Sequence, residues 1–490
     1  MIRRRDVLAG FALATVAALW LADLSAARPD PWMTLAAIGR GVLHPDFSDP
    51  GGMLWAAALT VAFAFCGVAL GAVAGLLLAP FYAATPVRLA CICLRAVHEL
   101  FWALLLFSVT GLSPLTGVLA IGLPYAGIFA KVFSEYLDDA PAAARLSRTV
   151  PRLTRLLWVQ LPQALPQMQT YTLYRLECGL RSSAVLGFIG LPTLGFQLET
   201  AFKQAQYGQA VAVLALFLAL ILPLRIWMIW RLVPVFLLAS VAALMTVAVP
   251  PMGDGAVLRF LTDIVPAPLR SGADWGDWLN KVFVAQALPG SVATLVLSQI
   301  ALAGAAVLAA LAFPAIVPRV VGRAGALAGH GVLVVLRSIP DYMLAFVLLQ
   351  ILGPSMLPAA LALGLHNGAI IAHLLGREAR GLPQRPDAPR GLTLWAWDLL
   401  PRLTPSFWAL CLYRWEIILR DSAIMGLLGI GTLGFYIQSN VQTLRMDRVI
   451  ALLVVSVALT LAVDTLSRRL RRAMQDGPAL RIEASRAAAS

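Results

Sequence analysis

Long apolar runs alternate with short polar loops along almost the whole chain. A helix of roughly 20 residues crosses the hydrocarbon core of a membrane, and each run is about that long. The hydropathy pattern therefore predicts an all-α integral membrane protein with about twelve spans. The expected spans are 7–24, 54–79, 90–109, 115–131, 167–190, 209–229, 232–250, 290–313, 329–352, 355–375, 406–430 and 449–467.

One stretch of the chain occurs twice. When the sequence is shifted by 239 residues, 174–196 aligns with 413–435, and 13 of the 23 positions are identical. About one or two identities are expected by chance at ordinary residue frequencies. Further upstream the shift becomes 242 and aligns Arg95 with Arg337. The chain is therefore predicted to hold two related halves in tandem.

The two halves are expected at 1–230 and 231–490, and each holds six of the predicted spans. Because six is an even number, both halves insert with the same orientation. They form a parallel repeat about an axis along the membrane normal, and a transport pathway is expected where they meet. Trp230 and Arg231 lie at the junction, which leaves almost no linker.

Composition and charge fit a lipid environment. Of the 490 residues, 60% are hydrophobic and 13% are charged, whereas soluble domains carry about 25% charged residues. The net charge of +13 comes from Lys and Arg in alternate loops, while the intervening loops hold most of the exposed acids. This pattern predicts a bacterial inner-membrane protein with both termini in the cytoplasm. The positive charge therefore indicates topology and contact with membrane lipid, and no nucleic-acid partner is expected.

The N-terminus and the cysteines require separate interpretation. Arg3, Arg4 and Arg5 before an apolar run resemble a secretory signal. We expect this first helix to be retained, because its removal would break the six-plus-six pattern. The 5 cysteines are scattered without metal-ligand or disulfide spacing, so neither a metal site nor a disulfide framework is expected.

The longest cytoplasmic loop of each half precedes its fifth span, at about 132–165 and 376–405. In the first loop, apolar residues recur at helical spacing between arginines, as far as Leu161 and Pro162. Such a helix suits docking into the groove of a partner protein. It equally suits a basic helix that lies on anionic headgroups.

These loops and the helices after them resemble the cytoplasmic "EAA" loop region of binding-protein-dependent ABC importer permeases, and most closely the phosphonate type. The resemblance rests on Leu161-Pro162-Gln163, Pro166-Gln167, Tyr174-Arg175-x-Glu177, Arg181-Ser182-Ser183 and Arg95-Ala-Val-His98-Glu99. It implies contact with two copies of an ABC ATPase subunit, and delivery of a phosphonate or related phosphorus oxyanion by a periplasmic binding protein. One chain would supply both halves, so a homodimer is not required. ATP and Mg would be bound by the ATPase, and no cofactor by this chain.

The resemblance places the coupling to the ATPase in these loops. The expected coupling residues are Arg145, Thr149, Leu153, Leu161, Pro162 and Pro401. The first loop departs from the family pattern, since the expected acid and glycine are missing near Arg145 and Thr149. Three prolines between 383 and 389 interrupt the second loop, so a shorter helix at 392–400 is expected there. The two halves are therefore predicted to couple unequally to the motor.

Ionisable side chains within the spans are the other candidates, because charges at that depth usually face the bundle interior or water. Glu177 and Arg181 lie four residues apart, as do Glu416 and Arg420, and such pairs can neutralise each other. They are expected either to lock helix packing near the two-fold axis or to line an anion pathway, since guanidinium suits phosphate-like groups. The full candidate set is Arg175, Glu177, Arg181, Arg414, Glu416, Arg420, His98, Glu99 and Asp341. The agreement between the membrane helices predicts a near-symmetric pore.

A twelve-helix secondary transporter of small anions shares the six-plus-six plan and is the alternative function. The loop at 80–89 lacks the Gly-x-x-x-Asp-Arg type of run that such a transporter would carry, and the loop joining the halves is very short. The sequence also lacks the serine-hydrolase, zinc-protease and phosphate-loop motifs. The chain is therefore expected to be a transport subunit and not an enzyme.

Overall fold

The computed structural model describes residues 4–26, 28–139, 150–249, 251, 253–383 and 389–475, and this part of the chain is helical without a β-strand. The first repeat contains α1 (Arg4–Leu21), α2 (Pro31–Leu43), α3 (Pro50–Leu78), η1 (Ala79–Phe81), α4 (Thr85–Ala96), α5 (Glu99–Thr110), α6 (Pro114–Asp138), α7 (Arg152–Arg155), η3 (Leu156–Gln160), α8 (Leu161–Val185), η4 (Leu186–Ile189), α9 (Leu194–Lys203), α10 (Tyr207–Ile221) and α11 (Leu224–Trp227).

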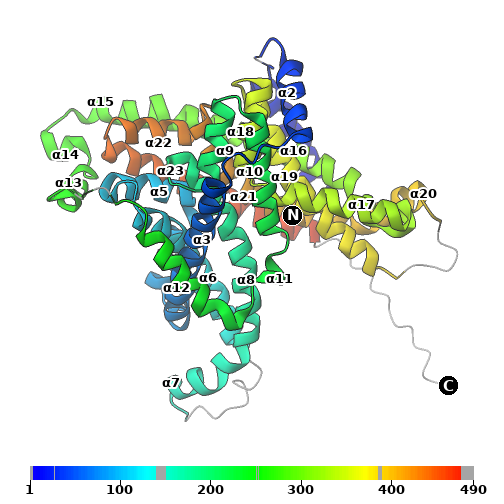
Figure 1. Cartoon of the computed structure of the whole chain (residues 1–490), viewed down its shortest axis with the longest axis horizontal. Coiled ribbons are helices and arrows are strands. Elements are labelled where there is room, and N and C mark those ends of the chain that lie inside the picture. The colour runs from blue at the N-terminus through cyan, green and yellow to red at the C-terminus, as the bar shows by residue number, and fades with distance from the viewer. Residues whose placement is uncertain are drawn as a thin grey trace.

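The second repeat follows the same order with additional short helices. It contains η5 (Trp230–Leu232), α12 (Val233–Met245), α13 (Ala256–Asp263), α14 (Ala267–Ser271), α15 (Trp275–Leu279), η6 (Asn280–Ala287), α16 (Leu288–Ala312), η7 (Phe313–Ile316), α17 (Pro318–Ser338), α18 (Asp341–Leu352), α19 (Met356–Gly381), α20 (Leu392–Leu394), η8 (Trp395–Leu399), α21 (Leu400–Ile424), η9 (Met425–Leu428), α22 (Leu433–Gln442) and α23 (Met446–Gln475). In Figure 1, α7 lies at the bottom and α20 at the right, whereas α2 lies at the top and α13 to α15 at the left.

Six helices of the described chain are long and apolar enough to cross a membrane, and the number is nine when each bent helix pair counts as one span. The shorter apolar helices α10 and α12 and the N-terminal α1 occupy other predicted positions. The twelve predicted spans thus correspond to α1, α3, α4–α5, α6, α8–α9, α10, α12, α16, α17–α18, α19, α21–α22 and α23.

The third predicted span, 90–109, is not one straight helix, and this part of the prediction was wrong. Helices α4 and α5 meet at an angle of 92°. His98 begins α5, and its Nδ1 accepts a hydrogen bond from the Leu100 amide at 3.2 Å. At the matching position of the second half, the chain breaks at Ile339 and Pro340, because proline disfavours a helical residue before it. Both breaks bring helix ends into the middle of the bundle.

The largest packing surfaces of the fold are those of α3 on α6 and of α16 on α19. Gly67, Gly71 and Gly75 recur on one face of α3, and a Cβ at any of them would collide with a side chain of α6. In the second half, fully buried alanines such as Ala301 and Ala305 take the corresponding places on α16. Small residues let two membrane helices approach closely, and this is how helices associate in lipid.

The first span of each half packs against the opposite half. Helix α1 lies against α16, where Gln299 Nε2 donates to Thr15 Oγ1 at 3.0 Å, and its Phe11 contacts Trp408 of α21 edge-on. Conversely, α12 of the second half lies along α3, where Phe236 packs 5.6 Å from Phe65 between ring centroids. This exchange interlocks the two repeats, so that neither half is covered by its own helices alone.

The fifth span of each half is longer than predicted. Pro162 was expected to close a separate cytoplasmic helix, but the helix runs without a break from Leu153 to Ile189. A π-helical turn at η3 directly precedes Pro162 in the first turn of α8, and η8 precedes Pro401 in the same way. Proline has no amide to donate, and the π-helical turn before it interrupts the regular hydrogen-bond ladder at the point where that donor is missing. Each loop is therefore rigidly continuous with its span.

The repeated glycines mark the far ends of these two helices. Gly190 and Gly429 have left-handed backbones with φ of 100° and 90°, and α9 and α22 continue from there at an angle of 46°. Gly187 and Gly426 lie against the next segment, where a Cβ would overlap a backbone nitrogen. The glycines thus produce a bent helix with its ends packed on each other, rather than simple helix termination.

We predict that Gly187→Ala destabilises the protein, because the new methyl group would overlap the amide of Phe196. Overpacking of this kind typically costs about 1–3 kcal/mol. Thermal unfolding in detergent should show a clearly lower Tm. Gly331→Ala is the matched control, because a Cβ there has nothing within 4 Å; equal Tm values for the two variants would contradict the packing.

Candidate functional site

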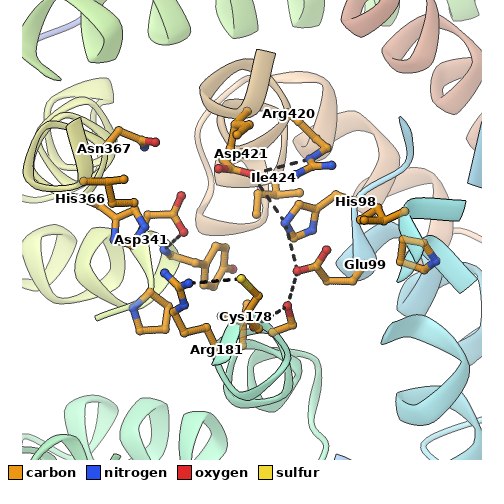
Figure 2. Close-up of a pocket in the computed structure, with 18 of the residues that line it drawn as sticks. His98, Glu99, Cys178, Arg181, Asp341, His366, Asn367, Arg420, Asp421 and Ile424 are labelled. Atoms are coloured by element: carbon orange, nitrogen blue, oxygen red, sulfur yellow. Dashed lines mark hydrogen bonds and ion pairs between the residues drawn. The ribbon is translucent and has the colours of Figure 1, made fainter. Parts of the chain in front are cut away.

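A cavity of about 180 Å³ lies between the two halves near the centre of the bundle. Figure 2 shows side chains that reach it from four sides, with His98 and Glu99 opposite Asp341 and His366, and Cys178 and Arg181 opposite Arg420 and Asp421. Its wall consists of His98, Glu99, Pro124, Tyr125, Ile128, Tyr174, Arg175, Cys178, Arg181, Ser182, Val185, Pro340, Asp341, Tyr342, His366, Asn367, Ile370, Arg414, Ile417, Arg420, Asp421 and Ile424.

Seven of the nine predicted membrane candidates line this cavity. They are the four arginines Arg175, Arg181, Arg414 and Arg420, together with His98, Glu99 and Asp341. Glu177 and Glu416 are not part of the wall, although each is one helical turn from an arginine that is. The fifth spans and the two chain breaks thus bring together groups that are far apart in the sequence.

The expected pairing of Glu177 with Arg181, and of Glu416 with Arg420, does not form an ion pair within 4 Å in the described chain. Arg181 Nη1 instead donates to the carbonyl of Arg337 at 3.2 Å, and Arg420 Nη1 donates to the carbonyl of Arg95 at 3.2 Å. Each arginine therefore binds the end of the broken helix in the opposite half. A carbonyl in the last turn of a helix lacks an intrahelical donor and carries the negative end of the helix dipole, so it competes well for the guanidinium.

A second set of contacts joins the halves around His98. Ser182 Oγ donates to Glu99 Oε1 at 2.6 Å. His98 Nε2 lies 3.6 Å from the same Glu99 oxygen and 3.7 Å from Asp421 Oδ1 of the second half. These side chains are largely buried, and a buried carboxylate requires such partners. The histidine thus lies between two carboxylates that belong to different repeats.

The environments of the other two arginines differ. Arg175 lies over the rings of Tyr125, Tyr171 and Tyr174, with its central carbon 5.2–5.7 Å from their centroids, and its Nε donates to the Tyr171 hydroxyl at 2.8 Å. Cation–π contacts of this kind hold a guanidinium in place. Its counterpart Arg414 has a long contact of 3.5 Å to Asn367 Oδ1.

The cavity has equivalent positions in both halves, but the chemistry of those positions differs. With the shifts of 239 and 242, Ser182 matches Asp421 and Tyr125 matches Asn367. None of Asp421, Tyr125 and Asn367 was among the candidates predicted from the sequence. The near-symmetric pore predicted from the sequence is therefore near-symmetric in backbone only. Aligning the fourth spans of the two halves with the shift of 242 would have identified Tyr125 and Asn367 as a matching pair with different side chains.

The coupling segments are α7 with η3 in the first half and α20 with η8 in the second. In contrast to the cavity, they present matching exposed side chains in the two halves. Leu153 and Leu392 match at the 239 shift and are 66% and 72% exposed, and Trp158 and Trp397 match and are 79% and 81% exposed. Large exposed apolar groups at corresponding points of two helices mark a repeated contact surface.

The remaining coupling candidates are placed as follows. Leu161 and Pro162 begin α8, and Pro401 lies in the first turn of α21. Arg145 and Thr149 lie outside the described residues.

The fold and the site together define a membrane permease with a polar cavity between two fused halves. Comparison with known proteins agrees. The chain is 26% identical to the phosphate-import permease protein PhnE of Mycolicibacterium smegmatis over 94% of this chain and 92% of that one. It is 32% identical to the phosphite transport system permease protein PtxC of Stutzerimonas stutzeri over 38% of this chain and 73% of that one. No family model and no solved structure matches it.

A third relative is also named as a transport system permease protein. The putative cryptic phosphonate transport system permease protein PhnE2 of Escherichia coli is 29% identical over 21% of this chain and 85% of that protein. The chain therefore belongs to the phosphonate and phosphite ABC importer permeases, with two permease halves in one polypeptide. It is a permease subunit and not an enzyme, and this membership argues against the secondary transporter.

Proposed function

We propose that this chain forms the membrane pathway for a phosphonate or related phosphorus oxyanion in an ATP-driven importer. A periplasmic binding protein delivers the anion, and two copies of an ABC ATPase subunit, which bind ATP and Mg, drive its passage. The protein lies in the bacterial inner membrane with both termini in the cytoplasm. The observation that carries the proposal is the cavity between the halves, which is lined by four arginines.

The chemistry of the wall suits phosphorus oxyanions. Guanidinium groups bind such anions with two parallel hydrogen bonds, and those in this wall come from both α8 and α21. The carboxylates of the wall would repel a fully deprotonated oxyanion. A phosphorus oxyanion that keeps a hydroxyl can donate it to a carboxylate. Asp341 lines the cavity beside Asp421 and is a carboxyl group that could accept such a hydrogen bond.

The two arginine bonds across the halves give the pathway a means of opening. Arg181 and Arg420 hold carbonyl oxygens of the opposite half, and an anion in the cavity competes for the same donors. Charge-assisted hydrogen bonds to an anion are stronger than those to a neutral carbonyl. The anion therefore weakens the connection between the halves as it binds, and the ATPase can then separate them.

The coupling segments explain how two identical motor subunits serve one chain. The paired residues Leu153 and Trp158, and their counterparts Leu392 and Trp397, present the same apolar side chains. Each segment continues into a fifth span that reaches the cavity. A push on either segment is therefore transmitted along one rigid helix to an arginine of the site. Coupling is proposed to be similar in the two halves.

We predict that Arg181→Gln and Arg420→Gln each lower phosphonate uptake at least about tenfold, because a charge-assisted hydrogen bond contributes about 1.5–3 kcal/mol. Glutamine keeps a neutral donor for the carbonyl of the opposite half, so the amount of assembled protein should not change. Uptake of labelled phosphonate by cells that depend on this importer is the measurement. Glu177→Gln is the control, because Glu177 does not line the cavity. Normal uptake by both arginine variants would leave these residues only a packing role.

We also predict that Trp158→Ala and Trp397→Ala each reduce the amount of ATPase subunit that co-purifies with the chain. Buried tryptophans at the centre of an interface often contribute about 2–4 kcal/mol. Trp32→Ala serves as the control, because Trp32 is equally exposed but lies on α2, away from the coupling segments. Full retention of the ATPase by both variants would mean that these tryptophans face the lipid interface instead.

A further inference from the structure

A second polar site lies far from the central cavity, where the beginning of α17 meets the end of α19. Two adjoining cavities of about 400 and 250 Å³ share Pro318 and Arg380. The larger is lined by Val317, Pro318, Arg319, Arg380 and Leu382, and the smaller by Pro318, Arg323, Ala326, Leu327, His330 and Arg380. Three arginines and a histidine therefore surround one small space, and no acidic residue is part of either wall.

The positive charge of this cluster is not compensated within the described chain. Arg380 Nε donates to the carbonyl of Ile316 at 2.6 Å, which fixes its position but adds no negative charge. Arg319 and Arg323 have neither an ion pair nor a side-chain hydrogen bond among the described residues. The nearest acid in the sequence, Glu378, accepts a hydrogen bond from Ser406 Oγ at 2.7 Å. The cluster can therefore accept an anionic group from outside the protein.

The cluster lies at the edge of an apolar surface. Helix α16 and η7 form a span that ends at Ile316, so the beginning of α17 lies where the chain leaves the hydrocarbon core. Beyond Arg323, α17 buries little of its surface and exposes Leu327, which is 75% exposed, together with Val332. A basic cavity next to a lipid-facing apolar helix matches an amphiphile with a negative head and two acyl chains.

The repeat itself does not require this cluster. The segment α17 spans 21 residues with a kink at Gly322, whereas its counterpart α4 has 12. The added residues at the beginning of α17 include Arg319 and Arg323, and Asp138 stands in the first half where the second has Arg380. A structural need of the fold would be expected in both halves. The cluster is therefore a specific feature of the second half.

We propose that this cluster binds the phosphate-bearing headgroup of an anionic phospholipid, with the acyl chains along the exposed face of α17. Arg319, Arg323 and Arg380 hold the phosphate group by charge-assisted hydrogen bonds. The bound lipid ties the beginning of α17 to the end of α19. This site is independent of the transported anion.

The test is native mass spectrometry of the full chain in detergent, titrated with phosphatidylglycerol or with phosphatidylcholine of the same chain length. The wild type should retain phosphatidylglycerol at least about fivefold better, since each arginine near an anionic headgroup contributes about 1 kcal/mol. Arg319→Gln combined with Arg323→Gln should abolish this preference. Arg88→Gln, on the equivalent helix α4, should leave it unchanged.

Three results would overturn the proposal. They are equal retention of the two lipids by the wild type, a preference that survives in the Arg319→Gln/Arg323→Gln variant, and displacement of the lipid by inorganic phosphate at the same concentration. The last would identify a site for a soluble anion. Both arginines are exposed, so the variant should keep the wild-type Tm in the same detergent. Arg380→Gln alone is a second variant, expected to weaken retention of phosphatidylglycerol.

Discussion

The structure depends on two hydrogen bonds that cross between the repeats, from Arg181 to the carbonyl of Arg337 and from Arg420 to the carbonyl of Arg95. The third span of each half is broken, and a broken helix leaves carbonyls without donors inside a medium that offers no water. A charged guanidinium in the same medium also requires partners. Each half therefore supplies a guanidinium donor for the unpaired carbonyl of the other half. The need to pair these groups fixes where the two fifth spans meet.

The exchange of the first spans has the same consequence on a larger scale. Because α1 packs on α16 and α12 packs on α3, the halves cannot simply drift apart in the membrane. Helices α8 and α21 pack on this interlocked core, α8 on α3 and α21 on α16 and α23. These two helices carry the arginines of the cavity at one end and the exposed coupling tryptophans at the other. Each fifth span thus connects an exposed tryptophan to the wall of the cavity.

The repeat, most of the spans and most of the charged residues of the cavity could be predicted from the sequence, because hydropathy and internal identity report directly on lipid contact and duplication. The partners of the charged groups could not. Spacing along one helix suggested that Glu177 would neutralise Arg181, but spacing does not reveal a carbonyl that a distant helix break brings to the same place. The break at His98 was missed for a related reason, since Arg95, His98 and Glu99 were interpreted as polar side chains within one continuous span.

Unequal coupling of the two halves stays a prediction, whereas the asymmetry of the cavity was not predicted. The loops differ in sequence near the prolines between 383 and 389. Beyond these prolines, Trp158 and Trp397 still align at the shift of 239, and both are exposed. The two halves also contribute different side chains to the cavity wall, where Ser182 of the first half corresponds to Asp421 of the second. A single chain that carries both halves is free to diversify its pathway, because each position of the wall is specified once. The exposed tryptophans Trp158 and Trp397, in contrast, are the same residue type in both halves.

The cavity between the halves is the proposed anion pathway, and the reactivity of Cys178 in its wall reports most directly on whether the anion enters it. This thiol lines the cavity and accepts a hydrogen bond from Arg181 Nη2 at 3.4 Å, whereas Cys93 is the only exposed cysteine of the described chain. In a Cys93→Ser importer assembled with its ATPase and binding protein, an anionic thiol reagent should modify Cys178, and added phosphonate should slow that reaction. A modification rate that phosphonate leaves unchanged would contradict the account.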